Sequence, residues 1–159
     1  MKKRFALLLA CLLALTAAAC SRGSAEADMK ASKPLDELAE EIAATVGATT
    51  LIREEDPDTL KEYFGYDLDK YAGYAIYNPP IVSADTIHIV ELTDIDDMTA
   101  AKAELEANKA RVVKAFDGYL PGPYAMAQEG QVVTKGRYAM LIISSDNAKA
   151  VELFNGAIS

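Results

Sequence analysis

Apolar and polar residues alternate along this chain with two different periods, one typical of helices and one typical of strands. Leu35, Leu38, Ile42 and Val46 recur at helical spacing, and Gly47 follows them at a position suited to a helix end. The residues between them are mostly acidic or alanine, so the opposite face of this helix is polar. The pattern predicts an amphipathic helix that packs against a core through one face.

Four further apolar runs have the composition of strands. They lie over residues 71–77, 85–92, 131–133 and 138–143. The second run contains Thr-Ile-His-Ile-Val, which is β-branched and nearly all apolar, so we expect it in the centre of a sheet. Lys135 and Gly136 form a plausible turn, which predicts that the last two strands make a hairpin.

Three more helices are predicted around these strands. A short one covers residues 56–65, and Asp96 or Asp97 is expected to cap the longest. The inward stripe of the longest helix is Met98, Ala101, Leu105, Asn108, Val112 and Phe116. Asp146 caps the last helix, whereas the Pro and Gly residues of 121–123 are predicted to break the chain.

The resulting order of elements is α-α-β-β-α-β-β-α. Hairpin pairs joined by helices predict an α+β domain with a mostly antiparallel four-stranded sheet and helices packed on one face. A layered βαβ sheet with one parallel pair of strands is the alternative. The core is expected to consist of Leu38, Ile42, Ile87, Ile89, Leu105, Val112, Phe116, Leu141, Ile143 and Phe154.

The first residues carry the pattern of an export signal. Three basic residues precede an uncharged, Leu/Ala-rich segment over residues 5–15. That segment is too short to span a bilayer, because spanning takes about 20 residues. Ala17 and Ala19 suit ordinary signal peptidase, which would leave a soluble secreted protein with a free Cys20. The same stretch resembles the lipobox of bacterial lipoproteins, in which the cysteine thiol is joined to diacylglycerol.

Cysteine usage favours the lipid anchor. The chain has two cysteines, and Cys11 would leave with the signal, so Cys20 would be the only thiol of the mature protein. Acylation removes an unpaired thiol, and two acyl chains give stable anchoring. We therefore expect a signal peptide over residues 1–19, a lipid anchor at Cys20 with a flexible tether over residues 20–33, and a single domain over residues 34–159. The expected location is the cell membrane, with the domain facing outside the cytoplasm.

The ordered set of motifs after Cys20 resembles a known family. The resemblance rests on residues 64–71, 83–90, 116–121, 132–138 and 144–146, together with Arg111 and Phe154. Over roughly residues 35–157 the chain is similar to domain-of-unknown-function family 4358, small lipoproteins of Firmicutes-type bacteria. The resemblance implies the same lipid anchor and location. It implies no activity and no catalytic residue.

Candidate chemistry is sparse in this sequence. The formal net charge of −8 disfavours nucleic acid as a partner. His88 is the only histidine, so we interpret it as a strand residue with satisfied hydrogen bonds rather than a zinc ligand. The carboxylate clusters of residues 67–69 and 94–97 lack the spacing of a calcium-binding EF-hand loop, and capping or solvation explains them. We therefore predict no catalytic residue, no metal and no other cofactor.

Five of the eight tyrosines lie within residues 63–77, which suggests a recognition surface. Strict alternation along the strand places Tyr71 and Tyr77 on the same face. We expect Tyr66, Tyr71 and Tyr119 to contact a partner, because they lie near the ends of predicted elements. The predicted function is a non-catalytic binding module of the cell envelope, with an envelope protein, a peptide or a glycan as partner. A carboxylate-dependent envelope hydrolase is the alternative, and a pair of acids in a cleft would favour it.

Overall fold

A five-stranded antiparallel sheet is the centre of the structure, a computed structural model that describes residues 26–159. Its strand order is β1-β2-β3-β5-β4, and every neighbouring pair is antiparallel. The strands are β1 (Ile52–Arg53), β2 (Tyr71–Asn78), β3 (Thr86–Leu92), β4 (Gln131–Lys135) and β5 (Tyr138–Ile143). The predicted α+β class with an antiparallel sheet is therefore confirmed, and the alternative with a parallel pair is wrong. The expected signal peptide and Cys20 lie outside the described residues.

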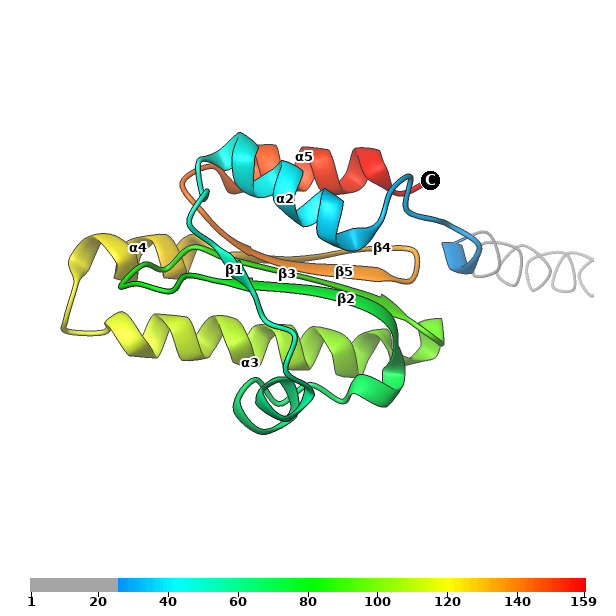
Figure 1. Ribbon diagram of the computed structural model, residues 1–159, viewed down its shortest axis with the longest axis horizontal. Helices are drawn as coiled ribbons and strands as arrows, with labels where there is room; N and C mark the ends of the chain where they lie inside the picture. Colours follow the sequence, from blue (N-terminus) through cyan, green and yellow to red (C-terminus); the bar gives the residue numbers. More distant parts are fainter. Residues whose placement is uncertain (1–25) are drawn as a thin grey trace, which may run out of the picture.

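Helices cover both faces of this sheet, as Figure 1 shows. On one face, α2 (Leu35–Val46) lies beside α5 (Asn147–Ala157). On the other face lies α3 (Met98–Phe116), followed by α4 (Pro121–Glu129). The short elements are the π-helix η1 (Thr59–Tyr63) and the 3-10 helices η2 (Leu68–Lys70) and η3 (Ile95–Asp97). Within residues 26–159, no helix combines the length and the apolarity that crossing a bilayer requires.

The expectation that helices pack on one face only is wrong, because the two central strands, β3 and β5, carry apolar side chains on both faces of the sheet. Ile87 and Ile89 of β3 belong to the core cluster under α2 and α5, whereas Val90 belongs to the cluster under α3. In the same way β5 contributes Met140 to the first cluster and Leu141 to the second. A strand that is apolar on both sides must be covered on both sides, since each exposed face would leave apolar area in water. Helices are therefore required on each face.

Local signals placed most elements correctly. α2 begins directly after Pro34 and ends at Gly47, which adopts a left-handed φ of 78° as the helix cap. Asp146 caps α5 by accepting a hydrogen bond from the Lys149 backbone amide at 3.0 Å. At the start of α3 the capping prediction is wrong, because the Asp94 side chain caps the preceding turn η3 instead.

Two elements were not expected. β1 adds a fifth strand of two residues at the sheet edge, paired with Tyr77 and Asn78 of β2. α4 begins at Pro121, in the stretch that was predicted to break the chain. Proline suits the first turn of a helix, because the amide that it lacks would have no partner within the helix there. The same residues therefore start a helix instead of ending one.

The predicted core is buried apart from one residue. Val112 is partly exposed, and the other nine expected residues are buried. These nine divide into two clusters on opposite sides of the sheet, so the domain has two apolar layers rather than one. Leu105 and Phe116 of α3 lie in the cluster that also borders the candidate site.

The chain that enters the domain runs along its C-terminal end. Ala31 forms a β-bridge with Ile158, and Lys30 and Ser159 exchange two backbone hydrogen bonds. The Ala31 amide also donates to the Tyr138 hydroxyl at 3.1 Å. Part of the segment that was expected to be a flexible tether is therefore paired with the domain, and the folded unit begins before residue 34.

Gly136 in the β4–β5 turn allows this entering segment to pass close by. It adopts a φ of 57°, and a Cβ placed on it would lie 2.7 Å from the Glu26 carbonyl oxygen and 2.9 Å from the Met29 Cβ. Gly118 has a similar φ of 68° but open space around it, so substitutions at the two glycines separate backbone strain from the loss of this close approach.

We predict that Gly118→Ala lowers the free energy of unfolding by about 1 kcal/mol through backbone strain alone. Gly136→Ala should lower it by about 1 kcal/mol more, because it also displaces residues 26–29. Urea unfolding measures both losses, and amide hydrogen exchange at residues 30–32 should rise only in Gly136→Ala. Equal losses and equal exchange in the two variants would contradict the close packing of this segment.

Candidate functional site

A cavity of about 300 Å³ lies on the α3 side of the sheet. Its walls come from three parts of the chain: the end of η1 with Phe64, the segment after β2 with Ile81, and the second half of α3 with Arg111. Its polar lining includes His88 of β3 and Asn78 at the end of β2. Residues distant in sequence thus meet around one hollow, which makes it the best candidate site in the described part of the chain.

Helical spacing brings the α3 contribution together. Asn108, Arg111, Val112 and Ala115 follow one another at intervals of three, one and three residues, so they share one face of the helix. Pro79, directly after Asn78, lacks the backbone N–H that would donate to a neighbouring strand, so it disfavours further strand pairing. The chain leaves the sheet there and forms the opposite wall.

His88 is buried, and both of its ring nitrogens have partners. Nδ1 lies 2.6 Å from the Tyr66 hydroxyl oxygen, and Nε2 lies 3.0 Å from Oδ1 of Asn78. A single tautomer satisfies both contacts: the tyrosine hydroxyl donates to Nδ1, and the Nε2 proton is donated to the amide oxygen. The interpretation of His88 as a strand histidine with satisfied hydrogen bonds is confirmed.

His88 remains neutral at physiological pH. Burial, together with the positive charge of Arg111, lowers the pKa of His88 from 6.5 to about 3. Burial also raises the pKa of the Tyr66 hydroxyl, so the hydroxyl keeps its proton. The chain of contacts from Tyr66 through His88 to Asn78 is thus an uncharged network. With both nitrogens engaged and no serine hydroxyl bonded to it, His88 has no nucleophile to activate among the described residues.

Arg111 supplies the positive charge of the cavity. Its guanidinium carbon lies 4.7 Å from the Tyr63 ring centre and 5.6 Å from the Phe64 ring centre. One of its nitrogens donates to Oδ1 of Asn108 at 2.5 Å. Asn108 is 2 % exposed and donates in turn to the carbonyl oxygens of Phe64 and Glu104, each at 2.9 Å. A buried amide and two aromatic rings therefore hold the guanidinium in place.

The three tyrosines predicted to form a binding surface lie in different surroundings. Tyr66 and Tyr71 are buried, with exposed fractions of 2 % and 9 %, whereas Tyr119 is 66 % exposed. The expectation that element ends present all three to a partner is therefore wrong for Tyr66 and Tyr71, whose hydroxyls bond to His88 and Glu104. Tyr119 stays a predicted contact residue.

A β-bulge explains why alternation misplaced the tyrosines of β2. The register pairs Tyr71 with Leu92 and Gly73 with Glu91, so one extra residue, Ala72, interrupts the alternation. As a result Tyr71 lies in the α3-side cluster, whereas Tyr77 lies in the α2-side cluster. The predicted shared face of these two residues is corrected.

The carboxylate clusters serve local structure. Asp67 pairs with Lys70 at 3.0 Å, and Asp94 caps η3. Among residues 26–159 no group of three or more His, Cys, Asp or Glu side chains is arranged to hold a metal ion.

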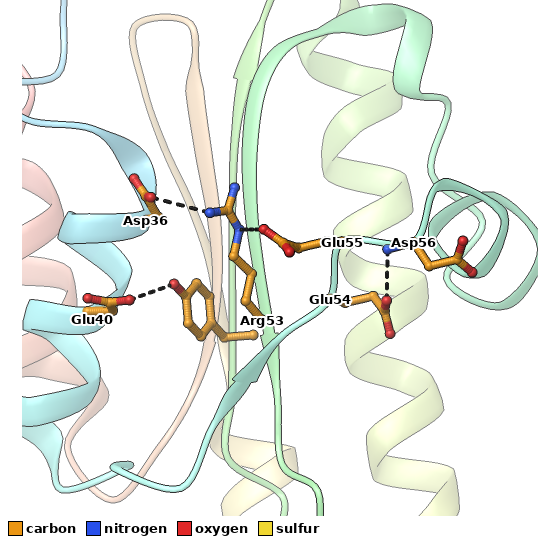
Figure 2. Close-up of polar contacts among 7 residues, drawn as sticks. Asp36, Glu40, Arg53, Glu54, Glu55 and Asp56 are labelled. Atoms are coloured by element: carbon orange, nitrogen blue, oxygen red, sulfur yellow. Dashed lines mark hydrogen bonds and ion pairs between the residues drawn. The ribbon is translucent and has the colours of Figure 1, made fainter.

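Acidic side chains also surround Arg53 at the β1 edge of the sheet. Figure 2 shows Arg53 between Asp36 of α2 and Glu55. The Arg53–Asp36 contact is 3.2 Å and the Arg53–Glu55 contact is 3.5 Å. In the same view Glu54 accepts a hydrogen bond from the Asp56 amide. Both ion pairs are solvated, so they hold the edge strand weakly and form no pocket for a ligand.

Sequence reasoning missed Arg111, Asn78 and Phe64 as site residues. One signal was present: Asn108 interrupts an otherwise apolar helical stripe, and a polar residue at a core position requires a buried partner. That partner is Arg111, three residues further along the helix. The aromatic rings above Arg111 come from a distant segment, and no local pattern links the two.

Fold and cavity together define a small α+β domain with a cavity that combines a cation, aromatic rings and an uncharged polar lining. Residues 46–144 match the family described as Domain of unknown function (DUF4358), and since this is more than half of the chain, the protein belongs to the DUF4358 family. The predicted membership is confirmed over this shorter range, which includes every residue that lines the cavity. No curated protein and no solved structure matches the chain.

The Tyr66–His88 contact should contribute measurably to stability. Tyr66→Phe leaves a buried nitrogen without its donor, so we expect a loss of about 1–3 kcal/mol in the free energy of unfolding. Tyr77→Phe is the control, because the Tyr77 hydroxyl donates to the exposed Glu40, where water can replace it. Its loss should be less than about 1 kcal/mol. Urea titrations of the two variants give the comparison, and equal losses would contradict a special role for the buried contact.

The lowered pKa of His88 predicts that the protein becomes less stable as the pH is lowered. The unfolded chain binds a proton below pH 6.5 and the folded chain does not until about pH 3, so protons favour unfolding between these values. We expect wild type to lose about 1–2 kcal/mol between pH 6.5 and pH 5. His88 is the only histidine, so His88→Gln should be nearly flat over this window. A flat wild-type profile in urea unfolding would refute a neutral, buried His88.

Proposed function

We propose that this protein is a lipid-anchored binding module on the outer face of the cell membrane, and that the Arg111 cavity is its binding site. Its anchor would be diacylglycerol joined to Cys20, as the leader pattern of residues 1–19 suggests. The cavity supports the binding role, because it offers a held cation and aromatic surface without a group suited to catalysis. Envelope peptides, glycans and proteins are the candidate partners.

The composition of the cavity carries this proposal. No carboxylate is among the residues that line it, and the one histidine there is neutral with both nitrogens engaged. A glycosidase needs two carboxyl groups facing each other across the substrate, one of them able to deliver a proton. The lining therefore favours binding over the alternative of a carboxylate-dependent hydrolase.

The more buried carboxylates serve other contacts. Glu104 accepts a hydrogen bond from the Tyr71 hydroxyl and lies 3.8 Å from the Lys70 ammonium. Glu91 pairs with Arg137 at 2.9 Å. Each carboxylate is thus held ionised by a cationic partner, which disfavours it as a proton donor, and neither lines the Arg111 cavity.

The placement of the cavity also suits a tethered receptor. The entering chain contacts the β4–β5 turn, since Glu26 and Met29 approach Gly136. Figure 1 shows this turn at one end of the sheet and the loop between β2 and β3 at the opposite end. Ile81 and Ser83 of that loop line the cavity. A lipid at Cys20 would therefore leave the cavity at the end of the domain remote from the anchor.

We predict that Cys20 carries the anchor. Intact-mass analysis of protein extracted from membranes should show cleavage before Cys20 and the added mass of a diacylglyceryl group. Cys20→Ala should move the protein out of the membrane fraction. An unmodified Cys20 thiol, or a mature chain that starts elsewhere, would contradict the proposal.

A separate assay tests binding against hydrolysis. Purified protein should release no more reducing ends or free amines from cell-wall material than buffer does, and Glu104→Gln should behave identically. Hydrolysis that this single carboxylate change abolishes would establish the alternative function and refute the binding module.

A further inference from the structure

We propose that the Arg111 cavity binds an organic carboxylate with a short apolar or aromatic body, either a free acid or the C-terminal carboxylate of a peptide. This inference rests on the proposed binding function and adds the class of ligand to it. Four features carry it: a free positive charge, its rigid placement, an unsatisfied amide donor and an apolar wall.

The first feature is a positive charge with no acidic partner. The ion pairs of residues 26–159 engage Lys33, Arg53, Lys70, Arg137 and Lys149 but not Arg111. Arg111 is partly buried and lines the cavity, so its charge faces this hollow without an acidic side chain to neutralise it. A bound anion would supply the missing counter-charge.

The second feature is the rigid placement of that charge. Arg111 donates to Asn108, which the backbone carbonyls of Phe64 and Glu104 hold from the other side. The Tyr63 and Phe64 rings contact its guanidinium as well. A guanidinium has five N–H donors, and the one contact to Asn108 leaves others for a ligand. A side chain already held in one geometry loses less entropy on binding.

The third feature is an unsatisfied donor in the same lining. The Asn78 side-chain oxygen accepts the hydrogen bond from Nε2 of His88, and the buried amide nitrogen Nδ2 of Asn78 has no hydrogen-bond partner among the described residues. A buried donor without a partner destabilises a protein by about the desolvation penalty of the group, so such atoms are rare. Asn78 lines the cavity, so a small turn of its side chain would bring this nitrogen to an acceptor oxygen on a ligand. A carboxylate has such oxygens and is an acceptor only.

The fourth feature is the apolar surface beside these donors. Ile81 and Tyr63 line the cavity and are 65 % and 60 % exposed, so apolar surface is open to a ligand there. Val112 and Phe116 continue this wall along α3. A ligand with an apolar body would cover these side chains while its acidic end meets Arg111.

One arginine favours a carboxylate over a phosphate. A single guanidinium neutralises one negative charge, and it matches the two oxygens of a carboxylate in a bidentate pair. A phosphate monoester carries nearly two charges at neutral pH and commonly needs further cations or a helix N-terminus. The cavity lining holds no lysine and no second arginine.

Calorimetric titration of the purified full chain with matched ligands tests this assignment. The free-acid probes are 3-phenylpropionate and N-acetyl-Ala-Phe with a free C-terminus, and their primary amides are the neutral controls. Each acid that the site accepts should bind about tenfold or more tightly than its amide, because only the acid forms charge-assisted hydrogen bonds. A preference confined to one pair identifies the source as a small acid or a peptide end. NMR shifts at Ile81 and Asn78 place the binding in the cavity.

Variants of two basic residues on α3 distinguish binding at the cavity from a general effect of the protein's charge. Arg111→Gln should abolish the preference for acid over amide, and Arg111→Lys should retain part of it, which also guards against a folding defect. Lys102→Gln removes the same charge from an exposed position of α3 outside the cavity and should change nothing. All variants are compared by circular dichroism before titration.

The possible failures are distinguishable. Equal binding of acids and amides in the cavity would overturn the carboxylate assignment and leave the binding function standing. Tighter binding of phenyl phosphate than of 3-phenylpropionate would replace the carboxylate with a phosphate ester. An unchanged preference in Arg111→Gln would remove Arg111 from the site. Absence of any shift at Ile81 or Asn78 with every probe would overturn both the ligand class and the cavity as the binding site.

Discussion

The burial of β3 and β5 on both faces is the constraint on which the rest of the structure depends. Their alternate side chains are apolar in both directions, so water must be excluded from each side of the sheet. α2 and α5 cover one side and α3 the other. A polar side chain on either face of these strands must then find its partners within the protein. His88 is such a residue, and its position determines much of the candidate site.

The site follows from how these buried polar groups are satisfied. Tyr66 and Asn78 engage the two nitrogens of His88, and Asn108 engages Arg111. The tyrosine, histidine and asparagine side chains in these contacts are all neutral. Arg111 therefore carries the one full charge in the lining of the cavity. In a low-dielectric setting such a charge favours an anion more strongly than an exposed arginine does. The same network explains why the cavity suits binding better than proton transfer.

Much of the secondary structure was predictable because its signals are local. A glycine after an apolar stripe ends α2, an aspartate starts α5, and the β-branched run around His88 is the central strand. The errors have equally specific causes. The break expected at Pro121 is wrong because proline also suits a helix start. The bulge at Ala72 places Tyr71 on the sheet face opposite to that of Tyr77.

The sequence by itself determined the α+β class, most element positions and nearly all of the core, because hydrophobic periodicity and capping act over a few residues. It also contained the export pattern and the family motifs. Only the tertiary structure decided that both sheet faces are covered and that Arg111, Asn78 and Phe64 surround one cavity. The contacts between these segments span tens of residues, as from Phe64 to Asn108. They depend on strand register and helix placement, which no short pattern encodes.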